Sequence, residues 1–520
     1  MRGGRDRDAA RVALVVLMVI VPALVAAAVA HLMAGGPIGP DAAAPVIAFD
    51  RLVAGQRLEG PLWQTSKPLL TLVYGVVHGL LDDWRAVSAV AILSFAAFVA
   101  IASLLAARIA RSAVAGAFVF VGLTLLPALL TDVVFAYGVS WAMLACAIAA
   151  AAVLGDRPRY AIAGIALAAG ALARPEILAV TAFALLATLV AWIGARVRHR
   201  PGPPRGAWLT ALGLVAIPVL MVHDGALAGD PLLWANIAQE NSAGHDGARS
   251  FAAVTALVAR HALSMAPLLP LVLLSVVHLL ARRRAVELVI VTIVPVAVAS
   301  FFILSGTRGT VIAVRYLVPI DVALMFAAGV GLGALDVPAV RARLATTHWL
   351  PAPSRTLPVL GLIVGAGLAL SLAPSWPRDA KARSVVRTQV ALQANATRAF
   401  GELRTLFTAP AWRGVPVPDD ARTQVLLPGP LRARGVVDLD LPLWAVEKLR
   451  PELIDPARGL PAPGTVIYHN RLADSAAKEW STIEVSEPTT TAKLRVVPLF
   501  VDEDAGIWIV RVEAADDQPG

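Results

Sequence analysis

From residue 40 the chain reads PDAAAPVIAFDRLVAG (residues 40–55), and from residue 64 it reads QTSKPL (residues 64–69). This stretch places two carboxylates, Asp41 and Asp50, and one lysine, Lys67, between long apolar runs. Charged side chains beside an apolar bundle are costly unless they are solvated, paired or functional. The sequence therefore predicts a polar first outer loop, residues 35–85, at one surface of a membrane-embedded protein.

The composition indicates a polytopic α-helical membrane protein. The 520 residues are 58% hydrophobic, and their mean hydropathy is +0.72. Apolar runs of about 20 residues recur, and each can cross a hydrocarbon core about 30 Å thick. The single cysteine, Cys146, excludes an internal disulfide. The net charge of +9 does not require nucleic acid as a partner, because arginines in short cytoplasmic loops account for much of it.

The apolar runs predict about 11 transmembrane helices. We expect them at about residues 12–34, 86–107, 113–131, 138–155, 160–173, 177–194, 207–223, 262–281, 285–304, 317–335 and 357–373. The apolar stretch 68–81 is short for a span, which favours an interfacial or re-entrant helix. Counting it as a span would move the arginine-rich loops to the outer side, against the positive-inside rule.

The arginines predict the orientation of the protein. With residues 1–11 in the cytoplasm, every inner loop carries arginine, whereas the outer loops carry the acidic residues. Such an asymmetry is typical of a multi-pass protein of the inner (plasma) membrane. We therefore expect a transmembrane domain over residues 12–373 and an extracytoplasmic domain over residues 374–520.

The C-terminal part changes to a polar composition without spanning runs. Residues 385–407 have the apolar spacing of a helix, and β-rich segments follow. These segments are residues 423–427, 436–441, 465–469, 494–500 and 507–512. Alternating helix and strand signals predict a small α/β or α+β domain.

Polar groups recur at the outer ends of the predicted spans. They are Asp41, Asp50 and Lys67 in the first loop, then Asp132, then Arg174 with Glu176, and finally Arg308 with Arg315 and Tyr316. A lipid-linked phosphate needs cations for the phosphate and an apolar groove for the lipid chain, and guanidinium groups suit phosphate well. A sugar hydroxyl that acts as a nucleophile needs a carboxylate to accept its proton.

The ordered set of these elements resembles the GT-C superfamily of polytopic glycosyltransferases, over about residues 12–373. The resemblance rests on six elements: the spacing from Asp41 to Gly55, TSKPL at 65–69, the acid of Thr131-Asp132, ARPE at 173–176, GDPL at 229–232 and RYLVP at 315–319. It implies that a hexose or pentose is moved from a polyprenyl-phosphate donor to an extracytoplasmic glycan, lipid or protein acceptor in cell-envelope biosynthesis.

The resemblance also implies roles for individual residues. Asp41 would be the general base, Asp132 would support it or orient the acceptor, and Asp50 is the alternative base. Arg174, Arg315, Lys67 and Arg308 would bind the donor phosphate, and Glu176, Tyr316, Trp63 and Trp234 would contact substrate. The family often has an acidic pair where Asp41 stands alone after Pro40, so the binding of a divalent cation is left open, and no other cofactor is implied.

Each of these residues also has a structural interpretation. Asp50 and Asp132 suit helix caps, Arg174 and Glu176 could pair with each other, and Arg315 could extend to the membrane interface. Trp63 and Trp234 suit an interfacial aromatic belt. Two other functions are compatible with the sequence, namely a flippase or transporter for lipid-linked sugars and a non-catalytic membrane assembly protein.

Overall fold

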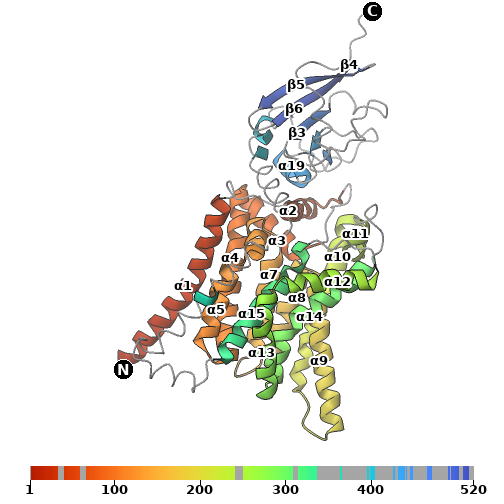
Figure 1. Cartoon of the computed structure of the whole chain (residues 1–520). Helices are drawn as coiled ribbons and strands as arrows, with labels where there is room; N and C mark the ends of the chain where they lie inside the picture. The colour runs from red at the N-terminus through yellow and green to blue at the C-terminus, as the bar shows by residue number, and fades with distance from the viewer. Residues whose placement is uncertain are drawn as a thin grey trace, which may run out of the picture.

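The computed structural model describes residues 2–32, 40–58, 66–240, 250–308, 314–335 and 363–365 of the first part of the chain. Toward the C-terminus it describes residues 395–396, 399–403, 425–427, 431–439, 441, 446–448, 465–470, 490–491, 494–502 and 507–514. These residues form a helical bundle with a β-sheet beyond one end, and helices α2 and α19 lie between the two (Figure 1).

The bundle contains the long apolar helices of the chain. Its first half comprises α1 (Arg2–Leu32), α4 (Trp84–Ala110), α5 (Ala113–Thr124), α6 (Pro127–Val134), α7 (Val139–Val153) and α8 (Tyr160–Ala173). Its second half comprises α9 (Ile177–Val197), η1 (Arg205–Val215), α10 (Ala216–Ala228), α12 (Phe251–Leu263), η2 (Ala266–Leu268), α13 (Leu269–Ala281), α14 (Ala285–Thr307), η3 (Val314–Leu317) and α15 (Val318–Ala334). One apolar core joins residues from α1 to α15.

The described helices agree in place with most of the predicted spans. Four of them are long and apolar enough to cross a bilayer, or up to six if each bent pair counts as one span. Shorter apolar helices, among them α7, α8 and α15, lie at three further predicted positions. Only residues 363–365 of the predicted span 357–373 are described, so the number of about 11 spans stays a prediction.

One expected span is bent instead of straight, and a second bend joins another expected span to a helix that was not expected. Helices α5 and α6 meet at 53°, and α12 and the helix after it meet at 65°. Pro127 begins α6, and Pro267 lies in η2 at the second bend. Proline lacks a backbone donor and restricts the residue before it, so a helix usually ends or kinks there. The continuous span expected at 113–131 is therefore corrected to a bent pair, whereas the span expected at 262–281 agrees in place with Ala266–Ala281, to which the unexpected helix α12 is joined at the second bend.

The first polar loop is largely helical: the helix expected at 68–81 is confirmed as a helix, whereas the helix over residues 40–53 corrects the expectation of a loop. Helix α2 covers Pro40–Val53, α3 covers Pro68–Leu81, and α11 (Leu233–Glu240) lies near the same end of the bundle (Figure 1). Proline is well tolerated where a helix begins, and the alanines that follow favour a helix. Helix α2 packs on both sides: Ala42 and Val46 belong to a cluster with α3 and the bundle, whereas Ala43 and Ile47 belong to a cluster with the C-terminal part.

The described strands of the C-terminal part form one mixed sheet in the order β2-β1-β3-β6-β5-β4. They are β1 (Val425–Leu427), β2 (Val446–Lys448), β3 (Val466–Asn470), β4 (Thr490–Thr491), β5 (Leu494–Asp502) and β6 (Ile507–Ala514). Strand β1 pairs in parallel with β2 and β3, and the remaining pairs are antiparallel. The strand expected at 436–441 is wrong, because residues Arg432–Asp438 form helix α19, in which Arg434 and Asp438 pair one turn apart at 2.8 Å.

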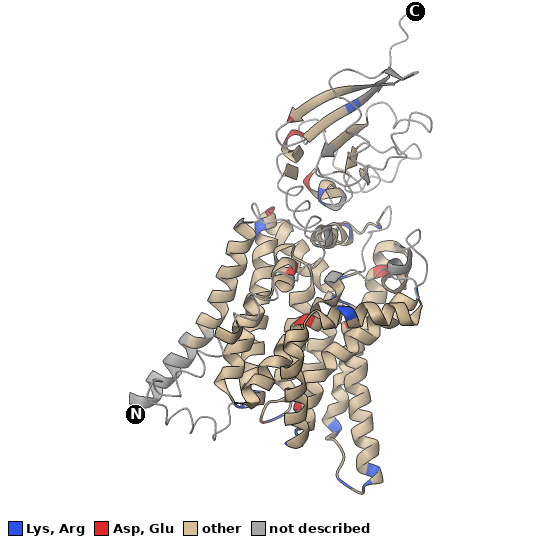
Figure 2. Cartoon of the chain, in the orientation of Figure 1, with Lys and Arg blue, Asp and Glu red and all other residues tan. Residues whose placement is uncertain are grey.

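A hydrogen bond joins the C-terminal part to the bundle. The indole Nε1 of Trp84, at the start of α4, donates to Oδ1 of Asp438 at 2.7 Å. Oδ2 of the same carboxylate accepts from Nε of Arg434 at 2.8 Å. Figure 2 shows that charged residues are sparse within the bundle and that several basic ones lie at the helix ends farthest from the sheet. This arrangement agrees with the arginine-bearing loops of the predicted inner side.

Candidate functional site

The turn between α6 and α7 buries a carboxylate. Asp132 is only 3% exposed and lies in the last turn of α6. Its Oδ2 accepts a hydrogen bond from the backbone N of Val139 at 3.2 Å, at the first turn of α7. The backbone O of Asp132 accepts from the backbone N of Tyr137 at 2.9 Å. Asp132 therefore satisfies the first backbone donor of the helix that follows, a capping contact as the structural interpretation of this residue anticipated, although Gly138 holds the N-cap position itself.

The turn between α8 and α9 buries an ion pair. Arg174 ends α8 in an extended conformation, and Glu176 directly precedes α9. Nε of Arg174 donates to Oε1 of Glu176, and the two residues are 8% and 5% exposed. A buried pair of this kind is strongly coupled, because removing either partner leaves the other charge unpaired.

These two turns touch each other. A side-chain carbon added at Gly138 would lie 3.0 Å from the backbone O of Ala173 and 3.3 Å from Cγ of Arg174. The guanidinium carbon of Arg174 lies 6.0 Å from the ring centre of Tyr316, within the range of a cation–π contact. Tyr316 in turn stacks on Phe302 with ring centres 6.0 Å apart. The structure thus brings together Asp132, Arg174, Glu176 and Tyr316, which are distant in sequence.

Helix α2 brings the first loop to the same place. Ala42 packs in one apolar cluster with Ala136, from the turn after α6, and Ala173, at the end of α8. Asp41, next to Ala42, therefore has its backbone beside this site, although its side chain lies outside the described set. The backbone of Arg315 also lies beside this site, because Arg315 directly precedes Tyr316 in η3. The side chain of Arg315 is also outside the described set.

Asp50 has a different place from the one expected. It was expected to suit the cap at the start of a helix, but it lies in the last turn of α2 and is half-buried. Its backbone O accepts from the backbone N of Ala54 at 3.0 Å. Asp41 and Asp50 therefore lie at opposite ends of one helix.

The remaining predicted residues that the structure describes lie on other elements. Lys67 directly precedes α3 and is half-buried, and Arg308 is exposed at the end of α14. Trp234 lies in α11, where its backbone N donates to Oδ2 of Asp224 at 2.7 Å. Trp63 lies outside the described residues.

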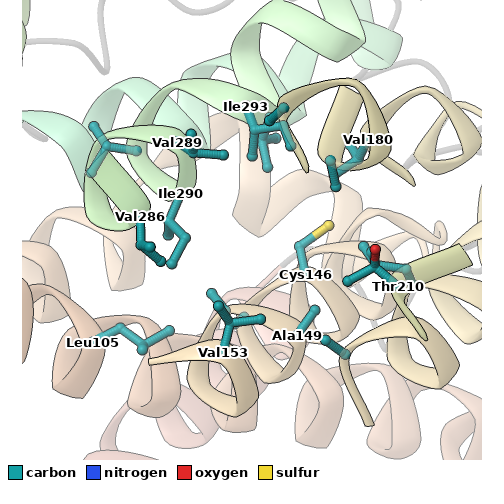
Figure 3. Close-up of a pocket in the computed structure, with 18 of the residues that line it drawn as sticks. Leu105, Cys146, Ala149, Val153, Val180, Thr210, Val286, Val289, Ile290 and Ile293 are labelled. Carbon is teal, nitrogen blue, oxygen red and sulfur yellow. The ribbon is translucent and has the colours of Figure 1, made fainter. Parts of the chain in front are cut away.

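An apolar cavity of about 410 Å³ lies within the bundle. Carbon side chains from α4, α7, α8, α9, α14 and α15 line it, with few polar groups such as Thr210 (Figure 3). Val180 in its wall lies one turn after Glu176, so the cavity reaches the level just below the Arg174–Glu176 pair. The charged groups therefore lie next to an apolar cavity, although none of them is among the residues that line it.

Two further pairs were not among the residues selected from the sequence. His223 and Asp224 pair at 2.9 Å at the end of α10, and His261 and Asp321 pair at 2.9 Å between α12 and α15. The first was visible as adjacent letters at a span end, and Asp321 as a lone acid in an apolar run. Among the described residues there is no group of three or more His, Cys, Asp or Glu side chains that could hold a metal ion.

Comparison with known proteins supports the fold. No family model and no curated protein sequence matches the chain. The structure of ArnT from Cupriavidus metallidurans bound to undecaprenyl phosphate aligns with 98% of this chain and 99% of that chain, at 16% identity and a TM-score of 0.53. The archaeal oligosaccharyltransferase AglB from Archaeoglobus fulgidus, in complex with an inhibitory peptide and a dolichol-phosphate, aligns with 97% of this chain and 74% of that chain, at 11% identity and a TM-score of 0.50. Both are GT-C superfamily members, so the chain has the fold that its sequence motifs indicated.

Proposed function

We propose that the protein is a glycosyltransferase that moves a sugar from a polyprenyl-phosphate donor to an extracytoplasmic glycan, lipid or protein acceptor. One observation carries this proposal: Asp132, the Arg174–Glu176 pair and Tyr316 converge one turn of α9 away from Val180 in the wall of an apolar cavity. A lipid-linked phosphate has the same division into a charged head and an apolar chain. Fold alone does not settle an activity, which depends on the site.

The donor would occupy both parts of the site. Its polyprenyl chain would enter the cavity, whose wall is almost entirely carbon. Glu176 engages Nε of Arg174 and so orients the guanidinium, leaving the terminal nitrogens to the phosphate. Arg315, Lys67 and Arg308 are the further candidates for phosphate contacts, and Glu176, Tyr316, Trp63 and Trp234 for contacts to the sugars.

The acceptor would be activated from helix α2. Its hydroxyl attacks the anomeric carbon while a carboxylate takes the proton, and the lipid phosphate departs with the electron pair of the broken bond. We assign the proton to Asp41, with Asp132 as the supporting carboxylate and Asp50 as the alternative base. Arg174 and Arg315 would stabilise the negative charge that the phosphate gains as it leaves.

The proposal also includes a location for the protein and for the reaction. The protein would lie in the inner membrane with residues 1–11 in the cytoplasm, and the transmembrane domain 12–373 would carry the site on the outer side. The C-terminal domain, residues 374–520, would cover that site, in support of which Trp84 bonds to Asp438 between the two parts. Cell-envelope biosynthesis is the process that such a reaction would serve.

The test supplies labelled polyprenyl-phosphate hexoses and pentoses to membranes that contain the protein. We expect one donor to label an extracytoplasmic acceptor, and Asp41→Asn to abolish the labelling while the protein still inserts. Unchanged turnover in Asp41→Asn would remove this residue from the mechanism. Movement of the labelled donor across the membrane without any transfer would instead favour the flippase.

A further inference from the structure

The end of helix α10 holds a histidine in a fixed orientation. Nδ1 of His223 lies 2.9 Å from Oδ1 of Asp224. Oδ2 of Asp224 accepts from the backbone N of Trp234 at 2.7 Å, so both carboxylate oxygens are occupied. Asp224 is 1% exposed, and the side chain of His223 is 9% exposed. The imidazole ring is thus held by a buried carboxylate that is itself held in place.

The other ring nitrogen of His223 has a free acceptor position. Nε2 is buried and has no hydrogen-bond partner within the part of the chain that the structure describes. A carboxylate only accepts hydrogen bonds, so Nδ1 carries the proton, and in the neutral ring Nε2 presents its lone pair. Buried polar atoms are rarely left unpaired, so a donor from outside the described residues is expected here.

A small cavity lies at this histidine. It has a volume of about 20 Å³ and is bordered by His223, Asp224, Lys67 and Thr71. Ala44 and Ala48 of α2 also border it, and Ala44 lies one turn after Asp41. A cavity of this volume holds one water-sized group. The cavity therefore lies between the histidine and the helix that carries the proposed base.

We propose that this cavity is a subsite for one hydroxyl group of a sugar acceptor, and that the hydroxyl donates its hydrogen bond to Nε2 of His223. A hydroxyl matches the volume, can donate to Nε2 and can accept from a neighbouring donor. The charge of Lys67 disfavours a second cation in the cavity, and the carboxylate of Asp224 disfavours an anion. That the hydroxyl belongs to a transfer acceptor rests on the proposed function, whereas the binding site itself does not.

The test follows the ¹⁵N resonance of Nε2 of His223 in the full-length protein. The protein is labelled with ¹⁵N-histidine in lipid nanodiscs, and the His223 signals are assigned with His223→Gln or, if that variant does not fold, with Asp224→Asn. The probes are methyl mannoside and methyl arabinoside, with permethylated mannoside as the matched compound without hydroxyls. His199, in the arginine-bearing segment after α9, provides an internal control.

We expect an unprotonated Nε2 whose resonance moves saturably with at least one glycoside, while permethylated mannoside and the His199 signals show no change. A protonated Nε2 would overturn the proposal. A resonance that no glycoside moves would also overturn it, because the cavity would then hold water only. So would a resonance that permethylated mannoside moves as much as the glycosides do.

The proposed function can fail independently of this result. No donor is present in the titration, so saturable glycoside binding at His223 in a protein without transfer activity would refute the transferase and keep the subsite. If transfer does occur, His223→Gln should raise the KM for the membrane-derived acceptor several-fold more than it lowers kcat. An equal rise in the KM for the donor and the KM for the acceptor would argue for a general structural role of His223.

Discussion

At the residue scale, Arg174 is both a structural and a proposed donor-binding group, and the two roles can be separated. Arg174→Gln leaves Glu176 buried without its partner, which costs about 3–5 kcal/mol. The double variant Arg174→Gln/Glu176→Gln removes both charges and should recover most of the melting temperature lost in the single variant. Sugar transfer should stay low in both, because neither retains the guanidinium. Thermal unfolding in detergent and transfer in membranes check the two effects.

Glu176→Gln alone completes this cycle of variants. It keeps the guanidinium but loses the carboxylate that orients it. We expect intermediate transfer, with the donor KM affected more than the acceptor KM. If the double variant regained both its stability and its transfer activity, the pair would be structural only, and another cation would have to bind the phosphate.

The structural role of Asp132 and its proposed role in proton transfer can also be separated, by substitutions at this one position. In Asp132→Asn the side-chain oxygen can still accept from the backbone N of Val139, so the fold should be kept while the negative charge is lost. If this charge supports proton transfer, the rate should fall by about 10²- to 10⁴-fold. Asp132→Ala should lower stability by about 1 kcal/mol in addition, because the helix cap is lost. Equal rates for Asp132→Asn and the unchanged protein would leave Asp132 as a cap.

At the scale of elements, the contact between α2 and α3 sets the position of Asp41. A side-chain carbon added at Gly75 would lie 2.1 Å from Cγ of Phe49, so Gly75→Ala must push α2 away from α3. Overpacking of this kind costs about 1–3 kcal/mol, and a displacement of 1 Å at a catalytic group can cost about 10²-fold in rate. We expect Gly75→Ala to fold and insert with a strongly reduced rate of transfer.

Gly79→Ala is the matched control, one turn further along the same helix. The added carbon would lie 3.8 Å from Cε1 of Phe49, an ordinary contact distance. Transfer rates in membranes, normalised to the amount of inserted protein, compare the two variants. Equal rates would show that the position of α2 does not control the reaction.

The elements also show which parts of the fold could be predicted. Long apolar runs predicted helices such as α4, α9 and α14, because a bilayer requires a certain length of apolar helix. Helix α2 was taken for a loop, because its prolines and acids suggest a turn until its packing on both sides is known. Helix α19 was taken in part for a strand, because the short apolar run that contains Val436 does not distinguish a buried helix from a buried strand.

At the scale of the molecule, the site depends on contacts that sequence spacing cannot supply. Arg174 was selected from its sequence motif. Its contacts with the ring of Tyr316 and with Gly138 form only when the helices are packed, so the sequence did not predict them. The topology predicted from arginines was enough to place these groups at one face. The His223–Asp224 pair was passed over, because only the structure shows that it borders a cavity.

The cavity within the bundle gives a prediction for the donor's lipid chain. Ala187 of α9 lines the cavity, so Ala187→Trp should fill part of it, whereas Leu186→Trp changes a neighbouring side chain that is 51% exposed outside it. Displacing two buried methylene groups of the lipid costs about 1.6 kcal/mol, which is about tenfold in the specificity for the donor.

We therefore expect Ala187→Trp to lower kcat/KM for a long-chain polyprenyl donor by at least about tenfold, and Leu186→Trp to have little effect. A donor with a chain of two isoprene units reaches less of the cavity, so Ala187→Trp should affect it less. The contrast between long and short donors distinguishes loss of lipid binding from a general distortion of the bundle, which would lower both rates alike. An equal loss with both donors would place the lipid chain outside this cavity, on the surface of the bundle.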